Sequence, residues 1–400
     1  MAEQKFYQLT PQQRRAQLNF DDSAIPVTTQ PTSQLIENYL GDFALPLGVV
    51  PNLIVDGRSF VVPMVTEEPS VVAAANNGAK HLNAGGGVQT NVTQRDMIGQ
   101  LLFEGASAET LEAFIVSRET QLFARAKAAH PSIVARGGGL KSLRVRSVSD
   151  TQMSVDFVVN TQDAMGANIV NTIGEALTLE FEAFSEQLLG VILSNYATES
   201  LTTARVSVPF AVLGGREVAQ RIAALSRFAA NDVYRATTEN KGVFNGLAAV
   251  VLATGNDWRA VEAAGHAYAA RDGQYRALTR WWVADDQLQG ELTLPLALGT
   301  VGGSISALPQ AKASLALLGE PDAPTLRSVV AAIGLAQNLA ALKAIANGGI
   351  QRGHMRMQYR ALALQIGATS TEVDAVVAQL QTHPVVNEAV AREILAEIRK

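Results

Sequence analysis

The chain has 400 residues, of which 48% are hydrophobic and 17% are charged, a composition typical of a chain that folds throughout into two or three domains. Its 32 Lys and Arg residues and 37 Asp and Glu residues give a net charge of −5, and no basic run is present, so no nucleic-acid partner is expected. The chain contains no cysteine, which excludes a disulfide framework, a thiolate zinc site and a catalytic thiol.

Neither export nor membrane insertion is predicted. The first thirty residues lack the apolar core of a signal peptide. The longest uncharged helical stretch, residues 328–342, contains Gln337 and Asn338 and is followed by Lys343, whereas a bilayer span needs about 20 mostly apolar residues. We therefore expect this stretch to be a buried core helix of a cytoplasmic protein that has no membrane partner.

The apolar patterns, taken along the chain, first predict helices and a hairpin. A helix is expected over residues 71–82, and helical spacing returns from about residue 106 to 130, ending before the glycines at 137–139. Apolar and polar residues then alternate over 143–147 and 153–159. This alternation on both sides of a polar turn predicts a β-hairpin.

The pattern after the hairpin predicts one small inserted domain. A helix is expected from about residue 164 toward 188, followed by strands at 191–193 and 204–208. The order helix, hairpin, helix, strands suits a split βαβ, ferredoxin-like domain. Helical, Ala- and Gly-rich sequence on both sides, including 71–82 before it and 259–270 and 326–346 after it, predicts a larger domain that surrounds it in sequence.

Together these patterns predict an α+β fold with three parts. After Gly367 two short helices are expected, broken at Pro384. The glycine clusters match neither GxGxxG nor GxxxxGK(S/T), so a Rossmann fingerprint and a P-loop are both excluded. The expected parts are a large, mostly helical domain at residues 1–105 and 215–350, an inserted ferredoxin-like domain at 106–214, and a small C-terminal helical flap at 351–400.

Residues 63–75 (PMVTEEPSVVAAA) predict a loop, an N-cap at Thr66 and an Ala-rich buried helix. Glu67 and Glu68 then lie at a helix N-terminus, where the helix dipole alone accounts for acidic residues. The spacing of these two carboxylates therefore leaves a structural and a catalytic role open.

Other single residues are equally ambiguous by themselves. Lys241, beside glycine, is typical of a solvated surface loop, and Asp257 is typical of a helix N-cap. His354 is one of five histidines, and a lone histidine is usually structural. Only a larger pattern can assign such residues to one site.

Five segments do occur in the order of one known family. They are residues 37–41 (ENYLG), 63–75, 232–246 (DVYRATTENKGVFNG), 253–263 (ATGNDWRAVEA) and 351–355 (QRGHM). Together they resemble the 3-hydroxy-3-methylglutaryl-CoA (HMG-CoA) reductases over nearly the whole chain. The doubled glutamate followed by Pro69 and Ser70 resembles the soluble bacterial class II form of the family.

This resemblance implies a set of site residues. A further segment, residues 163–168 (DAMGAN), resembles the family's nicotinamide-dinucleotide loop, and a helix N-terminus there would offer N–H groups to a pyrophosphate. The implied catalytic residues are Glu68, Lys241, Asp257 and His354; the implied substrate-binding residues are Ser70, Arg235 and Asn245; the implied cofactor-binding residues are Asp163, Met165, Gly166 and Asn168.

The implied reaction is the reduction of (S)-HMG-CoA to (R)-mevalonate and CoA by two NAD(P)H, through a mevaldyl-CoA hemithioacetal and mevaldehyde, in the mevalonate pathway of isoprenoid synthesis. Without a cysteine, hydride must reach the thioester directly. Lys241 would then stabilise the oxyanion, His354 would protonate the CoA thiolate and Glu68 would protonate the aldehyde oxygen. Asp257, hydrogen-bonded between Glu68 and Lys241, would complete one coupled unit.

The resemblance also bears on the cofactor and the assembly. Where NAD-preferring relatives carry an aspartate able to bind the ribose 2′-OH, this chain has His130, which favours NADP(H) while NAD(H) stays possible. No metal is expected, because the five histidines lack ligand spacing. A homodimer with the active site at the subunit interface is implied. The alternatives are an NAD-dependent mevalonate oxidiser and a catalytically silent CoA-binding scaffold.

Overall fold

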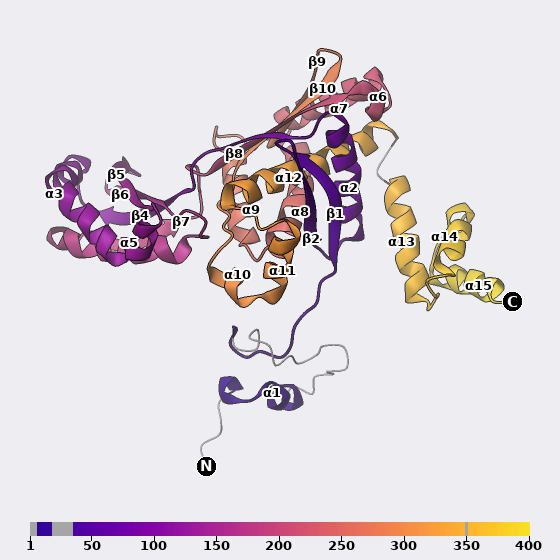
Figure 1. The fold of residues 1–400 in the computed structure, drawn as a ribbon, viewed down its shortest axis with the longest axis horizontal. Coiled ribbons are helices and arrows are strands. Elements are labelled where there is room, and N and C mark those ends of the chain that lie inside the picture. The colour runs from indigo at the N-terminus through magenta and orange to yellow at the C-terminus, as the bar shows by residue number, and fades with distance from the viewer. Residues whose placement is uncertain (1–5, 18–34, 349–350) are drawn as a thin grey trace.

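The computed structural model describes residues 6–17, 35–348 and 351–400, and the side chains of Tyr7, Ser304 and residues 351–357 lie outside this description. The chain forms a mixed α+β structure with three visible parts (Figure 1). A small unit of strands and helices lies at one end, a large central part follows, and three C-terminal helices lie at the other end.

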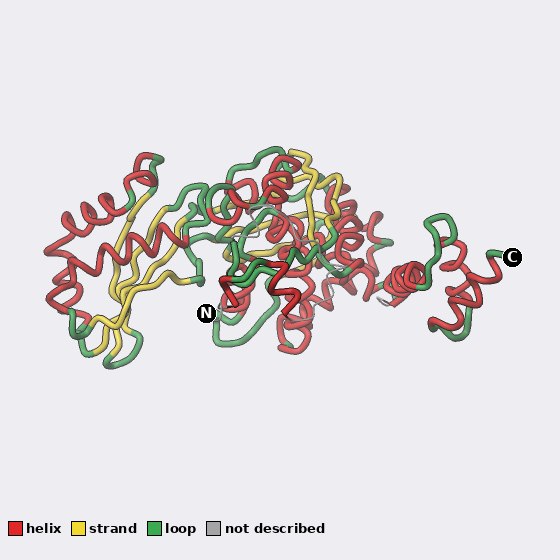
Figure 2. Tube along the Cα trace, turned by 90° about the horizontal axis from the view of Figure 1, so that it is seen from below, coloured by secondary structure: helices red, strands yellow, loops and turns green. Residues whose placement is uncertain are grey.

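The small unit is a four-stranded antiparallel sheet with its helices on one face (Figure 2). The strand order is β5-β6-β4-β7, and the chain order β-α-β-β-α-β is that of a split βαβ unit. The predicted hairpin is confirmed, since β5 and β6 pair in antiparallel register. The elements are β4 (Asp96–Glu104), α3 (Ala108–Ala129), α4 (Pro131–Ala135), β5 (Gly139–Ser147), β6 (Gln152–Asn160), α5 (Ala167–Thr178), η3 (Leu179–Phe184) and β7 (Leu188–Ser194).

The structure corrects the expected limits of this unit. Its first strand, β4, begins at Asp96, ten residues before the expected start. The strand β8 (Leu201–Pro209) does not belong to it, because β8 pairs with β3 (Gln89–Val92) and β10 (Gln287–Pro295) of the central sheet. The alternation at 204–208 identified a strand correctly but could not identify its partners, which are distant in sequence. The helix expected from residue 164 to 188 is shorter, because α5 ends at Thr178 and gives way to a 3-10 segment.

The central part combines a second antiparallel sheet, of order β3-β8-β10-β9, with a two-stranded hairpin and several helices. The helices expected over residues 71–82 and 259–270 are confirmed as α2 and α9. The bounds of these two helices and of the other elements of this part are β1 (Leu47–Val55), β2 (Arg58–Val65), α2 (Pro69–Ala84), α6 (Phe210–Leu213), α7 (Arg216–Asn231), α8 (Val233–Ala253), α9 (Trp258–Ala269), β9 (Thr279–Ala284), α10 (Gly303–Ala307) and α11 (Pro309–Leu317).

The helix α12 (Ala323–Ala346) is the centre of this part and packs against α2 and α8. It is long and apolar enough to cross a membrane, yet 72% of its most apolar window is buried inside the structure. A helix that is apolar on all sides is typical of a core position, so the expected buried core helix is confirmed. Gly78 permits the close approach of α2, because a Cβ there would lie 1.9 Å from the Ala336 carbonyl oxygen.

The two ends of the chain form small structures of their own. The helices α13 (Gln351–Gln365), α14 (Val373–Thr382) and α15 (Glu388–Ile398) share a separate hydrophobic core, and the expected break at Pro384 is confirmed. Near the N-terminus lie η1 (Phe6–Gln8) and α1 (Pro11–Gln17).

Candidate active site

Lys241 and Glu68, which are 173 positions apart in sequence, meet at the surface of the central part. Lys241 Nζ lies 3.4 Å from Glu68 Oε2, and the two side chains are 65% and 36% exposed. Glu68 directly precedes α2, whereas Lys241 lies within α8. The expectation of a surface loop around Lys241 was therefore wrong. Gly246 does not mark a loop but allows α8 to pack closely against α12, since a Cβ there would lie 3.0 Å from Gln337 and Ile333 of α12.

Both oxygens of the Glu68 carboxylate have a neighbour that fixes them. Ser70 Oγ donates a hydrogen bond of 2.5 Å to Oε1, on the opposite oxygen from Lys241. The N-cap of α2 is Glu68 itself rather than Thr66 as expected, and the Thr66 hydroxyl accepts a hydrogen bond from the Glu68 N–H at 3.2 Å. The expected substrate-binding residue Ser70 therefore orients the expected acid.

Asp257 is the N-cap of α9, where its Oδ1 accepts hydrogen bonds from the N–H groups of Arg259 and Ala260 at 3.0 and 3.1 Å. Burial acts to raise the pKa of Asp257, but the hydrogen bonds from Ala260 and Arg259 outweigh it, so the pKa lies below its usual value. Within the described residues its partners are Arg259 and Ala260, and the expected bridge to Glu68 and Lys241 is not formed here. The helix N-terminus and the adjacent guanidinium hold the carboxylate instead.

The expected substrate-binding residues Arg235 and Asn245 lie on α8 with Lys241. Arg235 Nη2 is 2.9 Å from Oε2 of Glu239, whose side chain is fully buried, and Thr279 Oγ1 donates to the other oxygen at 3.0 Å. Burial raises the pKa of Glu239, although the charge of Arg235 opposes this. Asn245 is half-buried one helical turn after Lys241.

The segment expected to bind the cofactor is a loop that ends at Gly166, the N-cap of α5, with a φ of +92°. The helix was expected to begin near residue 164, but it begins at Ala167, and Asp163 fixes the preceding loop to the central part. Its carboxylate accepts from Ala323 N–H at 2.9 Å, and its carbonyl oxygen accepts from Thr300 N–H at 2.8 Å. The loop that precedes α5 is thus held by residues of the central part.

A buried arginine that the sequence did not single out also holds this loop. Arg95 is 4% exposed, and its Nη2 donates to the carbonyl oxygens of Ala164 and Met165 at 3.2 and 2.7 Å. Burial lowers the pKa of Arg95 to about 9, so the group still carries its charge at neutral pH. Met165 packs against the central core, and Asn168 is exposed at the start of α5.

The two remaining expected residues are His130 and His354. His130 is half-buried between α3 and α4, with Nδ1 3.2 Å from Ser132 Oγ. His354 falls in α13, and its side chain is outside the described part of the structure. Among the residues that are described, no three potential metal ligands gather.

Asn256 is a residue of the site that sequence reasoning missed. Its side-chain amide exchanges two hydrogen bonds with the backbone of Gly299, at 2.8 and 3.0 Å, and the residue is 6% exposed. Its position directly before Asp257 was a visible signal, but its partner is 43 residues away. Asn256 therefore links the start of α9 to the segment that holds the loop of residues 163–166, where the cofactor was expected to bind.

Comparisons with known proteins decide the family of this site. A model of the family described as hydroxymethylglutaryl-coenzyme A reductase matches residues 5–359. The chain belongs to this family. An HMG-CoA reductase from Archaeoglobus fulgidus is 42% identical over 377 residues, which cover 92% of this chain and 85% of the relative. The family reaction, the NAD(P)H-dependent reduction of HMG-CoA to mevalonate, is therefore the activity of this chain.

Solved structures of HMG-CoA reductases are similar throughout. One from Streptococcus pneumoniae has a TM-score of 0.78 and 44% identity, covering 98% of this chain and 94% of that one. A second, described as a class II enzyme bound to NADPH in open conformations, has a TM-score of 0.78 and 43% identity, covering 98% of this chain and 96% of that one. The resemblance of the sequence to the class II form is thereby confirmed.

Proposed function

We propose that Glu68, Lys241, Asp257 and His354 carry out the two successive reductions of HMG-CoA. The observation that carries this proposal is the pair of Lys241 Nζ and Glu68 Oε2 at 3.4 Å, a cation and a carboxylate beside each other, one within α8 and one at the N-cap of α2. When bound, the nicotinamide cofactor supplies one hydride for each step. The side chains of the chain supply charge and protons.

In the first step the thioester carbonyl becomes a tetrahedral oxyanion. Lys241 lies where a fixed positive charge can stabilise that oxygen, and preorganised charge of this kind lowers a barrier by about 3–4 kcal/mol. The carbon–sulfur bond then breaks, and CoA leaves as a thiolate. His354 is the proposed donor of the proton to that sulfur, since an imidazolium has a pKa of about 6.5 in its unperturbed state.

In the second step hydride addition to the aldehyde carbon leaves an alkoxide. Glu68 is the proposed donor of its proton, so the two protons of the overall reaction come from His354 and Glu68. Burial or a negative charge close to Glu68 would favour the protonated form of its carboxyl group. We propose that substrate binding moves Asp257 from Arg259 to Lys241 and Glu68, forming one coupled unit of the three side chains.

Substrate and cofactor have separate proposed binding residues. Arg235 suits the free carboxylate of HMG-CoA because a guanidinium binds a carboxylate in two-point fashion. Ser70, which contacts Glu68, and Asn245, one helical turn after Lys241, are the other proposed substrate-binding residues. The loop of Asp163, Met165 and Gly166 fits a dinucleotide phosphate, because α5 begins at Ala167 and the N–H groups of its first turn lack intrahelical partners.

The cofactor is proposed to be NADP(H). His130 in place of a carboxylate does not repel a 2′-phosphate, and one similar Streptococcus structure is described as bound to NADPH. The unit of β4 to β7 with α3 and α5 is the proposed dinucleotide domain, the central part the substrate domain, and α13 to α15 the flap that brings His354 to the substrate.

A homodimer is proposed because large apolar side chains are exposed beside Arg235. Phe228, Val233 and Tyr234, at the junction of α7 and α8, are 62%, 45% and 83% exposed. An apolar cluster of this kind beside a polar site is typical of a subunit interface. We also propose that the protein acts in the cytoplasm, as expected from its sequence.

The test follows absorbance at 340 nm with purified protein and HMG-CoA, with NADPH or NADH, beside Lys241→Ala. We expect about two cofactor molecules to be oxidised per CoA released, with loss of turnover in the variant. Turnover that runs only from mevalonate and CoA with NAD⁺ would favour the catabolic oxidiser, and no turnover in either direction would favour the silent scaffold.

A further inference from the structure

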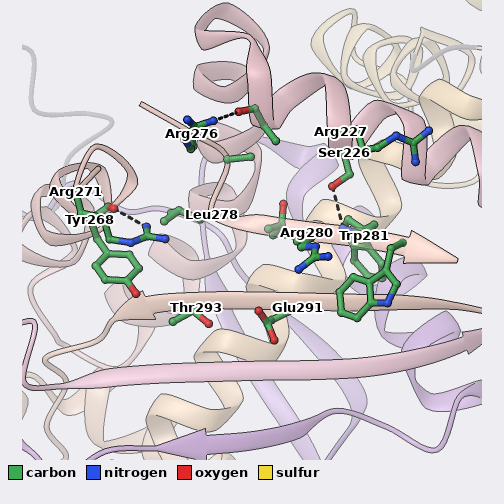
Figure 3. A pocket seen from close by; sticks show the side chains of 14 residues that line it. Ser226, Arg227, Tyr268, Arg271, Arg276, Leu278, Arg280, Trp281, Glu291 and Thr293 are labelled. Atoms are coloured by element: carbon green, nitrogen blue, oxygen red, sulfur yellow. Dashed lines mark hydrogen bonds between the residues drawn. The ribbon is translucent and has the colours of Figure 1, made fainter. Parts of the chain in front are cut away.

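A hollow of about 510 Å³ lies between the C-terminal ends of α7 and α9 and the edge strand β9 (Figure 3). None of Glu68, Lys241 and residues 163–168 lines it. Its walls carry the guanidinium groups of Arg227, Arg271, Arg276 and Arg280. Four arginines around one hollow are unexpected in a chain whose net charge is −5.

Three of these guanidinium groups are oriented by neutral groups. Arg271 Nη1 donates to the carbonyl oxygen of Tyr268 at 2.8 Å and lies 4.1 Å from the centre of its ring. Arg276 Nη1 donates to the carbonyl oxygen of Ala230 at 2.6 Å. Arg280 lies 4.9 Å from the centre of the Trp282 ring. These contacts fix the side chains without neutralising their charge.

Acidic residues near the hollow do not balance this charge. Glu291 is the carboxylate among the lining residues, and Arg205 already pairs with it at 2.6 Å. Asp272 lies 3.9 Å from Arg271, but both side chains are well exposed, so the pair is weak. Elsewhere on the chain arginines pair closely with carboxylates, as in Arg125–Glu180 at 2.7 Å, Arg146–Asp156 at 2.8 Å and Arg399–Glu372 at 2.9 Å.

We propose that this hollow binds a small phosphorylated anion of the diphosphate class. Guanidinium forks match phosphate oxygens in pairs, and prior orientation lowers the entropic cost of binding. The volume lies within the range of small-molecule sites, about 300–1,000 Å³. The rings of Tyr268 and Trp282 already carry arginines and Trp281 is buried, so the anionic group is recognised rather than a nucleobase.

Residues 276–279, which line the hollow, are hydrogen-bonded directly to the two residues before Lys241. Asn240 is fully buried, and its side-chain amide donates to the Arg276 carbonyl at 2.9 Å and accepts from Leu278 N–H at 2.8 Å. Thr279 donates to Glu239, which in turn holds Arg235. An anion that tightens residues 276–280 therefore stabilises the arrangement of α8 that presents Arg235 and Lys241. This second half of the proposal rests on the proposed function.

The binding half is tested by titration calorimetry of the full chain with inorganic diphosphate, in the presence of saturating NADPH. We expect saturable binding at one site, weaker binding of inorganic phosphate, and an affinity at least about tenfold lower in Arg271→Gln/Arg280→Gln. Arg118→Gln/Arg392→Gln removes two exposed arginines far from the hollow in sequence and should bind as the unchanged chain does. No saturable heat, or equal affinity in both double variants, overturns the proposal.

The coupling half is tested by steady-state kinetics with HMG-CoA. Diphosphate is expected to lower the KM for HMG-CoA in the unchanged chain and in Arg118→Gln/Arg392→Gln, but not in Arg271→Gln/Arg280→Gln. An unchanged KM despite binding overturns the coupling. Failure of the proposed function is seen separately, as absence of turnover without any diphosphate.

Discussion

The side chain of Asn256 takes the place of a β-strand neighbour for Gly299, donating to its carbonyl oxygen at 3.0 Å and accepting from its N–H at 2.8 Å. The next residues, Thr300 and Val301, donate their N–H groups to the Asp163 carbonyl oxygen. The cap of α9 and the loop before α5 are therefore joined through one short segment. A change at Asn256 should therefore reach the proposed cofactor loop through Gly299 and the residues that follow it.

Asn256→Ala is expected to leave the Gly299 backbone groups buried without partners, which costs about 1–3 kcal/mol in the free energy of unfolding. Because the segment at 299–301 loses its support, the KM for NADPH should rise more than the KM for HMG-CoA. Urea unfolding and steady-state kinetics measure both. Asn231→Ala, at the exposed end of α7, is the control, and equal shifts in the two KM values would contradict a positioning role.

Gly299→Ala tests the same segment by steric means. A Cβ at Gly299 would lie 2.4 Å from Met165 N and 2.6 Å from Ala164 C, so the cofactor loop must shift. The KM for NADPH is expected to rise while the thioester site keeps its affinity for HMG-CoA. Gly190→Ala is the matched control, because no atom lies within 4 Å of a Cβ there. A normal KM for NADPH in Gly299→Ala would count against this prediction.

Lys241→Met is expected to lower kcat on the order of 10²–10³-fold, because the oxyanion loses its fixed positive charge. The side chain is 65% exposed, so the melting temperature should change little. Lys312→Met, on the surface of α11, should keep full turnover. A variant at 241 that turns over at the normal rate would remove Lys241 from the catalytic set.

His130→Asp is expected to shift cofactor preference from NADPH toward NADH. A carboxylate at this position repels a 2′-phosphate and accepts hydrogen bonds from a free ribose. The ratio of kcat/KM for NADPH to that for NADH should fall by at least about tenfold, which corresponds to about 1.4 kcal/mol. An unchanged ratio would show that His130 does not contact the ribose.

Stability should depend on pH through His81. Its Nδ1 lies 2.6 Å from the Asn77 carbonyl oxygen, which leaves Nε2 to accept from Lys343 Nζ. Burial lowers the pKa of His81 below 6.5, although the hydrogen bond to the Asn77 carbonyl acts to raise it. The charge of Lys343 lowers the pKa further. As the pH falls, the unfolded chain therefore binds the proton before the folded chain does. The contribution of His81 to the free energy of unfolding is complete above about pH 7 and decreases as the pH drops below 6.5 toward the pKa of the folded state.

Urea unfolding between about pH 5 and pH 8 checks this prediction. His81→Asn should be less stable at neutral pH but show a flatter dependence on pH. His383→Asn changes an exposed histidine and should keep the slope of the unchanged chain. An unchanged slope in His81→Asn would assign the pH dependence to other groups.

Local sequence pattern determined most of the elements. The hairpin of β5 and β6, the core helix α12 and the break at Pro384 were all predictable, because side-chain period and proline act within a few residues. Family resemblance named Glu68, Lys241 and Asp257 together, and two of them do meet.

Only the tertiary structure decided the partners. The strand β8 belongs to the central sheet, Asp163 lies before α5 and binds the N–H of Ala323, and Asp257 pairs with Arg259 rather than Lys241. Lys241 lies in a helix because α8 packs against α12, which outweighs the low helix propensity of two glycines. Each of these outcomes depends on contacts between segments that are distant in sequence or on competition between hydrogen-bond partners. Residue type and spacing show which groups are present, but the free energy of burial and pairing decides which of them meet.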